Sequence, residues 1–105
     1  MAKSDEAKVK DKVVDYIEEL HDTYNIPIKV FNRSGYTPVQ GLPDLYAVIY
    51  GFHLEIELKG IGGTPSPAQL RFEREIKDLG SLYVRPGSFQ EFKKYIDMLI
   101  EALKK

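Results

Sequence analysis

Two carboxylates and a lysine in the middle of the chain have the types and spacing that a metal-dependent hydrolytic site requires. Asp44 follows Pro43 at the start of one predicted strand, and Glu57 and Lys59 stand near the end of the next. Carboxylate oxygens are the ligands that Mg²⁺ prefers, and Mg²⁺ usually takes only one or two of them from protein. A lysine beside such an ion can orient a water molecule or stabilise charge in a transition state. These residues form the candidate catalytic centre.

A tight hairpin brings the two carboxylates together. The strands predicted at residues 44–49 and 52–59 are separated by only two residues, the second of which is Gly51. The register of such a loop, continued outward, places Asp44 directly opposite Glu57 on one face of the sheet, with Cβ atoms roughly 4.5–5.5 Å apart. Because like charges destabilise such a pair, we expect a cation between them.

The second strand of the hairpin alternates between apolar and charged side chains. Its apolar residues face one way, and Glu55, Glu57 and Lys59 face the other. This pattern is also typical of an ordinary half-exposed strand with a solvated face, and that alternative stays open for each charged residue taken singly. Glu55 pairs across the hairpin with Tyr46, further along the strand from Asp44. We therefore expect Glu55 to be exposed or to lie behind the metal ligands.

Three helices and two further strands must position the hairpin. Capping residues, apolar spacing and Gly/Pro breaks predict a helix at 5–23, a strand at 26–31, the hairpin, a helix at 66–79, a strand at 82–85 and a helix from Phe89 to Leu103. Both later helices open on an apparent capping box, Ser66 with Gln69 and Ser88 with Glu91. This α-β-β-β-α-β-α order predicts an α/β domain over residues 1–105, with helices covering a four-stranded mixed sheet.

The composition excludes several other classes of protein. The chain has 105 residues, 43% of them hydrophobic, a net charge of −1 and no Cys, so disulfides, thiolate zinc sites and cysteine nucleophiles are excluded. His21 and His53 lack the spacing of zinc ligands, which argues against a zinc site. No stretch approaches the roughly 20 apolar residues of a membrane span, and residues 1–12 are charged. We expect a soluble, cytoplasmic protein without a membrane partner.

The order and spacing of these motifs resemble a known superfamily of nucleases. Pro43-Asp44, followed by Glu57-Leu58-Lys59 on an αβββαβ chain, resembles the PD-(D/E)XK nucleases, which have a restriction-endonuclease-like core. The segments 41–45 and 66–69 are further similar to the VRR-NUC group, in its small stand-alone form found in phages and bacteria. The resemblance extends over residues 6–91, which is nearly the whole chain.

The resemblance implies an activity, a cofactor and a substrate. It implies an endonuclease that uses Mg²⁺ or Mn²⁺ to hydrolyse phosphodiester bonds in structured DNA, most often four-way (Holliday) junctions, as a homodimer in a bacterial or phage-infected cell. The residues implied by position are the metal ligands Asp44, Glu57 and the Leu58 carbonyl, Lys59 for the nucleophilic water, Glu6 near the metal directly or through water, and Gln69 as a further catalytic residue.

Several alternatives remain at this level. Glu6 is equally explained as a first-turn acid favoured by the helix dipole, and Gln69 as half of a capping box. In place of a junction nuclease, the chain could be a flap or other structure-specific nuclease subunit of a repair or restriction assembly. It could also be a non-catalytic DNA-binding or partner-binding domain of the same fold.

DNA contact and dimerisation draw on separate residues. The candidate phosphate contacts are Arg33, Arg71, Arg74, Arg85, Lys93 and Lys94. Of these, Arg33 and Arg85 stand at strand ends beside loops, where sites are commonly built. Two cuts across a junction need two sites, which a two-fold dimer supplies. The aromatic residues expected to be exposed at its interface are Tyr36, Tyr46, Tyr50, Phe52 and Tyr83.

Overall fold

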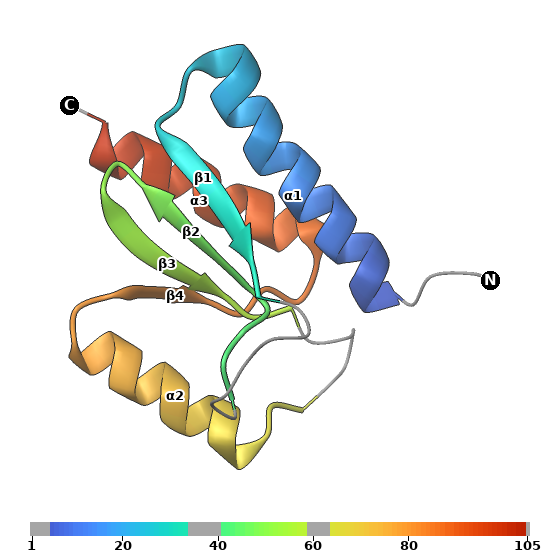
Figure 1. Ribbon diagram of the computed structural model, residues 1–105, viewed down its shortest axis with the longest axis vertical. Coiled ribbons are helices and arrows are strands. Elements are labelled where there is room, and N and C mark those ends of the chain that lie inside the picture. The colour runs from blue at the N-terminus through green and yellow to red at the C-terminus, as the bar shows by residue number, and fades with distance from the viewer. Residues whose placement is uncertain (1–4, 34–40, 59–63, 105) are drawn as a thin grey trace.

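The computed structural model describes residues 5–33, 41–58 and 64–104. These segments form three helices and a four-stranded sheet (Figure 1). In chain order the elements are α1 (Asp5–Tyr24), β1 (Ile28–Asn32), β2 (Leu45–Ile49), β3 (Phe52–Ile56), α2 (Pro67–Asp78), β4 (Leu82–Val84) and α3 (Phe89–Leu103). The predicted order of elements is confirmed. Among the described helices, none has the length and apolar character needed to cross a membrane.

The sheet is mixed, with the strands in the order β1-β2-β3-β4. The pairs β1–β2 and β2–β3 are antiparallel, and β4 returns through α2 to pair parallel to β3. Ile49 pairs with Phe52, which confirms the predicted hairpin register. Tyr50 and Gly51 both adopt positive φ, 49° and 82°, as the two central residues of a tight hairpin turn of this kind must.

The hydrophobic core lies on one face of the sheet. Helices α1 and α3 pack against each other and cover that face, whereas α2 lies on the other side beside β4 (Figure 1). The fully buried core residues of the strands are Leu45, Ala47, Ile49, Leu54 and Ile56, and those of α3 are Phe92 and Ile96. Because side chains alternate along a strand, the opposite face carries the polar residues of β2 and β3. The candidate site is on this second face.

The strand boundaries differ from prediction by one to three residues, most notably at the start of β1, the start of β2 and the end of β3. Strand β1 begins two residues late, because Asn25 adopts a left-handed conformation and the Ile26 N–H donates to the Leu20 carbonyl, so the chain is still leaving α1. The pairing of β2 with β3 stops at Leu45 and Ile56, short of the predicted residues 44 and 57–59. The hairpin therefore parts at the end where the candidate carboxylates stand.

The helix caps follow the sequence signals, with one change. Ser66 accepts a hydrogen bond from the Gln69 N–H, and the Gln69 side chain accepts one from the Ser66 N–H, which completes the predicted capping box of α2. Ser88 caps α3 in the same way, but the Glu91 carboxylate accepts the N–H of Gly87 rather than that of Ser88. The second predicted capping box is only half formed.

Candidate active site

Asp44 and Glu57 lie one step beyond the last paired residues of β2 and β3. Each keeps a backbone hydrogen bond to the strand on its outer side instead. The Asp44 carbonyl accepts the Arg33 N–H, at the end of β1, at 2.6 Å, and the Glu57 N–H donates to the Val84 carbonyl of β4 at 3.0 Å. The two middle strands thus separate while the sheet continues on either side. Their register places both carboxylates at the same end and on the same face of the hairpin.

A lysine from the first helix accompanies Asp44. The Asp44 side chain is 51% exposed, and the Lys10 Nζ lies 3.6 Å from its Oδ2. This is a cation of the kind that the like-charged pair was expected to require. The sequence analysis did not identify Lys10, although a signal was present, because Lys10 stands seven residues before the buried Ile17 on the inward side of α1.

Glu57 is in a different environment from Asp44. It is only 6% exposed, next to the buried Leu58, and the buried Tyr83 lies close by on β4. Burial, together with the negative charges of Glu57 and Glu73, raises the pKa of the Tyr83 hydroxyl well above its usual range. The site therefore pairs one exposed carboxylate with one carboxylate that is held against the sheet.

Two other predicted catalytic residues, Lys59 and Glu6, are not brought into contact with Asp44 or Glu57 by any described interaction. Lys59 falls outside the described residues. Glu6 lies on α1, half-buried and one helical turn before Lys10. No three His, Cys, Asp or Glu side chains within the described segments gather closely enough to hold a metal ion together, so Glu6 does not form such a group with Asp44 and Glu57. A contact of Glu6 through water stays a prediction.

The start of α2 is packed against the segment that leads into Asp44. Gly41 has φ +88°, and a Cβ at this position would lie 2.5 Å from the Ala68 carbonyl oxygen and 3.0 Å from the Gln69 nitrogen. Only glycine permits this approach. The Gln69 backbone thus lies close to Gly41, but the Gln69 side-chain oxygen already accepts the Ser66 N–H at 2.8 Å, so a catalytic role of Gln69 stays a prediction.

Arg33 and Glu55 form a buried ion pair beside the candidate metal ligands. The Arg33 guanidinium donates two hydrogen bonds to the Glu55 carboxylate, at 2.7 and 2.8 Å, and a third to the Pro43 carbonyl at 2.9 Å. This pairing raises the pKa of Arg33 further above its ordinary value. Glu55 is only 2% exposed, so the prediction that it is exposed was wrong, and its place behind the metal ligands stays a prediction. The arginine ties β1 to the residue preceding Asp44.

Aromatic rings extend this network across three strands. Tyr46 stacks between Phe31 and His53, with ring centroids 4.9 and 5.1 Å away, and the Arg33 guanidinium lies 4.3 Å from its ring. His53 in turn contacts the Glu55 carboxylate. The ring faces of Tyr46 are therefore occupied by its neighbours.

The predicted set of exposed aromatic residues is only partly correct. Tyr83 is buried, with 8% of its surface exposed, because Phe72 and α2 pack over it. Tyr50 is half-buried against the core. Phe52 is 51% exposed, as expected for an interface residue, and Tyr36 falls outside the described residues.

The remaining basic candidates lie on the α2 side of the site and on α3. Arg71 and Arg74 are exposed on α2, and Lys93 and Lys94 are exposed on α3. Arg85 follows β4 beside Glu57 and lies 3.3 Å from Glu73. Burial opposes ionisation of Glu73, but hydrogen bonds and charge from Lys77 and Arg85 prevail and lower its pKa. Arg74, Lys77 and Arg85 line one shallow hollow with that acid.

The donor set fits a hard divalent cation. Asp44 and Glu57 supply two carboxylates, the number that Mg²⁺ commonly takes from protein, and the Leu58 carbonyl follows directly on the same strand end. Their oxygen chemistry also suits Mn²⁺. Of these two carboxylates, Asp44 is on the open side and Glu57 on the buried side.

The overall fold is similar to that of a solved structure described as a VRR_NUC domain. The likeness has a TM-score of 0.69 at 24% sequence identity, and it covers 90% of this chain and 97% of the other. No protein-family model and no curated protein matches the sequence. The predicted fold, a restriction-endonuclease-like α/β core with a C-terminal helix, is confirmed.

Proposed function

We propose that the chain is a DNA endonuclease of the VRR-NUC type that depends on Mg²⁺ or Mn²⁺. The observation that carries the proposal is that Asp44 and Glu57 each stand one residue beyond the last pair of β2 and β3, at the end where these strands part. The likeness in fold to a VRR_NUC domain supports the same function. A half-exposed strand with a solvated face does not explain why Glu57 is buried.

Each residue of the site has a distinct task in this proposal. Asp44, Glu57 and the Leu58 carbonyl hold the cation, which when bound supplies Lewis-acid activation of a phosphate and of a water molecule. Lys59, which follows Leu58 in the sequence, orients that water or stabilises the charge that develops on the phosphate. Lys10 balances the charge of Asp44 from α1. Arg33 and Glu55 fix the backbone that presents Asp44 and act as positioning residues.

The proposed substrate is structured DNA, foremost the four-way junction. The exposed Arg71 and Arg74 of α2, with Arg85, which follows the Val84 that Glu57 bonds, offer phosphate contacts. Because a junction must be cut on two strands, we propose that the chain acts as a homodimer. The proposed setting is the cytoplasm of a bacterium or of a phage-infected cell.

A cleavage panel tests this function. The full chain is incubated with end-labelled four-way junction, flap, duplex and single-stranded DNA, in Mg²⁺, in Mn²⁺ and in chelator. We expect metal-dependent cutting of the junction at paired positions, and none in chelator. Cutting of flaps alone would favour the role of a flap nuclease subunit, and DNA binding without cutting would contradict the enzymatic proposal.

A further inference from the structure

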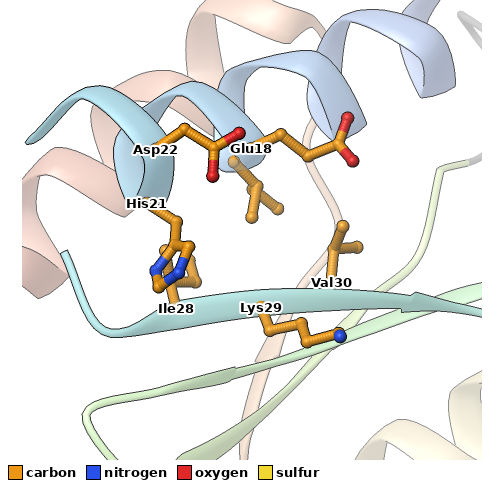
Figure 2. A pocket seen from close by; sticks show the side chains of 7 residues that line it. Glu18, His21, Asp22, Ile28, Lys29 and Val30 are labelled. Atoms are coloured by element: carbon orange, nitrogen blue, oxygen red, sulfur yellow. The ribbon is translucent and has the colours of Figure 1, made fainter. Parts of the chain in front are cut away.

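A groove separate from the candidate active site lies between the C-terminal half of α1 and the edge strand β1. It has a volume of about 270 Å³. Figure 2 shows its two sides: Glu18, His21 and Asp22 of the helix above, and Ile28 and Val30 of the strand below. Asp44 lies near the opposite end of α1, beside Lys10.

The open edge of β1 runs along this groove. Strand β1 pairs with β2 on one side, and on its other side no strand of the described segments pairs with it. On the β2 side, the Arg33 N–H donates to the Asp44 carbonyl. At the other end, just before β1 begins, the Pro27 carbonyl accepts the Tyr50 N–H. Because inward and outward residues alternate along an antiparallel strand, Val30 directs its N–H and its carbonyl away from β2. An extended segment can pair with such an edge.

The helical side of the groove is strongly acidic. Residues 13–28 include Asp15, Glu18, Glu19 and Asp22 and contain no Lys or Arg. Glu18 and Asp22 stand one helical turn apart above the groove (Figure 2), and neither forms an ion pair with any other described residue. Lys29 of β1 also lines the groove, but its side chain is directed away from the helix (Figure 2), and its Nζ lies 5.7 Å from the centroid of the Phe31 ring.

The floor of the groove is apolar. Ile17, Ile28 and Val30 line it, and Ile17 and Ile28 belong to the hydrophobic core. An apolar floor beneath two carboxylates matches a lysine or arginine side chain, whose methylene groups cover apolar surface while the charged head reaches the acids. The combination of floor, rim and open edge therefore describes one kind of ligand.

We propose that this groove binds an extended, basic segment of a protein partner. The segment adds to β1 as a strand and places a Lys or Arg between Glu18 and Asp22. Because side chains alternate along a strand, the residues two positions before and after the basic residue also face the groove and its apolar floor. The recognised pattern is therefore a basic residue flanked at every second position by small or apolar residues. A second copy of this chain, paired through β1, would bring two acidic α1 ends to one edge, so charge favours the basic partner.

Selection of peptides from a library tests the proposal without reference to DNA. A phage-displayed library of random nine-residue peptides is selected against the immobilised full chain, and the enriched sequences are synthesised with a fluorophore for anisotropy titration. We expect extended sequences with a Lys or Arg, whose affinity falls as salt rises. Failure to enrich any sequence over the blank surface would overturn the proposal.

Two variants locate the binding. The double variant Glu18→Gln/Asp22→Asn should weaken the selected peptides at least about tenfold, because the cation loses both partners. Its matched control, Glu75→Gln/Asp78→Asn, removes the same charge from exposed positions of α2 and should leave the affinity within about twofold. Equal weakening by both variants would mean binding by net charge alone, which contradicts the groove.

The variant Val30→Pro examines the strand edge. Proline removes the outward N–H but none of the bonds to β2, so the sheet remains and peptide pairing is lost. Thermal melting and circular dichroism confirm that the variant is folded. If Val30→Pro instead converts a dimer into a monomer and no basic peptide binds the parent chain, the edge belongs to a second copy and the proposal is wrong.

Discussion

The ion pair between Arg33 and Glu55 gives the most quantitative prediction. The Glu55 carboxylate is 2% exposed and accepts both guanidinium hydrogen bonds, and the Arg33 side chain is 20% exposed. Replacing Arg33 with Met leaves a buried carboxylate whose remaining side-chain contact, among the described residues, is with His53. Removing one partner of a buried pair typically costs about 3–5 kcal/mol, because the remaining charge is uncompensated.

The double variant separates the pair's own contribution from the cost of breaking it. With Met at both positions neither charge of the pair is left buried. The contact of His53 with the Glu55 carboxylate is lost, and the losses on the Arg33 side are the guanidinium contact with Tyr46 and the bond to the Pro43 carbonyl. These are worth about 1–2 kcal/mol together. We therefore expect Arg33→Met/Glu55→Met to be more stable than Arg33→Met alone.

Urea unfolding measures all four proteins of this cycle. For slopes of about 1–3 kcal/mol/M, a loss of 3 kcal/mol moves the midpoint by about 1–3 M. We expect a large shift for each single variant and a smaller one for the double variant. Additive losses, with the double variant least stable, would show that the two side chains act independently and would refute the bidentate pair.

Four other predictions concern the site and the buried tyrosines. Gly41→Ala should lower the free energy of unfolding, measured by urea titration, by about 2–4 kcal/mol. The reason is that the new Cβ, at a position with positive φ, would lie 2.5 Å from the Ala68 carbonyl oxygen. Tyr83→Phe should be neutral or stabilising by about 1 kcal/mol in thermal melting, since the buried hydroxyl has no hydrogen-bond partner among the described residues. Burial, and secondly the neighbouring acids, raise the pKa of Tyr16 and Tyr83. Their contribution to stability is therefore complete below pH 10 and declines as the pH rises further. Absorbance at 295 nm should show tyrosines that ionise late, and ordinary titration of all tyrosines would contradict this. Lys59→Ala should abolish most turnover while calorimetric Mn²⁺ binding stays near that of the parent, and normal cleavage would remove Lys59 from the mechanism.

The hairpin could be predicted from sequence because its geometry is local. A two-residue loop fixes the register, so the opposition of Asp44 and Glu57 follows from counting outward from the turn. The capping box of α2 is local in the same sense, since Ser66 and Gln69 are three residues apart. Features of this kind need no knowledge of how distant segments pack.

The ion pairs could not be predicted because they depend on distant segments. Arg33 reaches Glu55 only because β1 pairs with β2 in one register, and the loop that joins these strands does not determine that register. Lys10 reaches Asp44 only through the angle at which α1 crosses the sheet. The burial of Glu55 depends on the same packing. The sequence alone shows only that Glu55 alternates with apolar residues, and this pattern suggested a solvated face.

Single-turnover cleavage by two isosteric variants tests the metal site most directly. A labelled four-way junction is incubated in Mn²⁺ with the parent chain, with Asp44→Asn and Glu57→Gln, and with Asp78→Asn and Glu75→Gln as matched controls on α2. We predict that each site variant loses at least about 100-fold in rate, while the controls cut like the parent and all variants melt as folded proteins. Folded Asp44→Asn and Glu57→Gln that still cleave at the parent rate would contradict the assignment of these carboxylates as the centre of the nuclease.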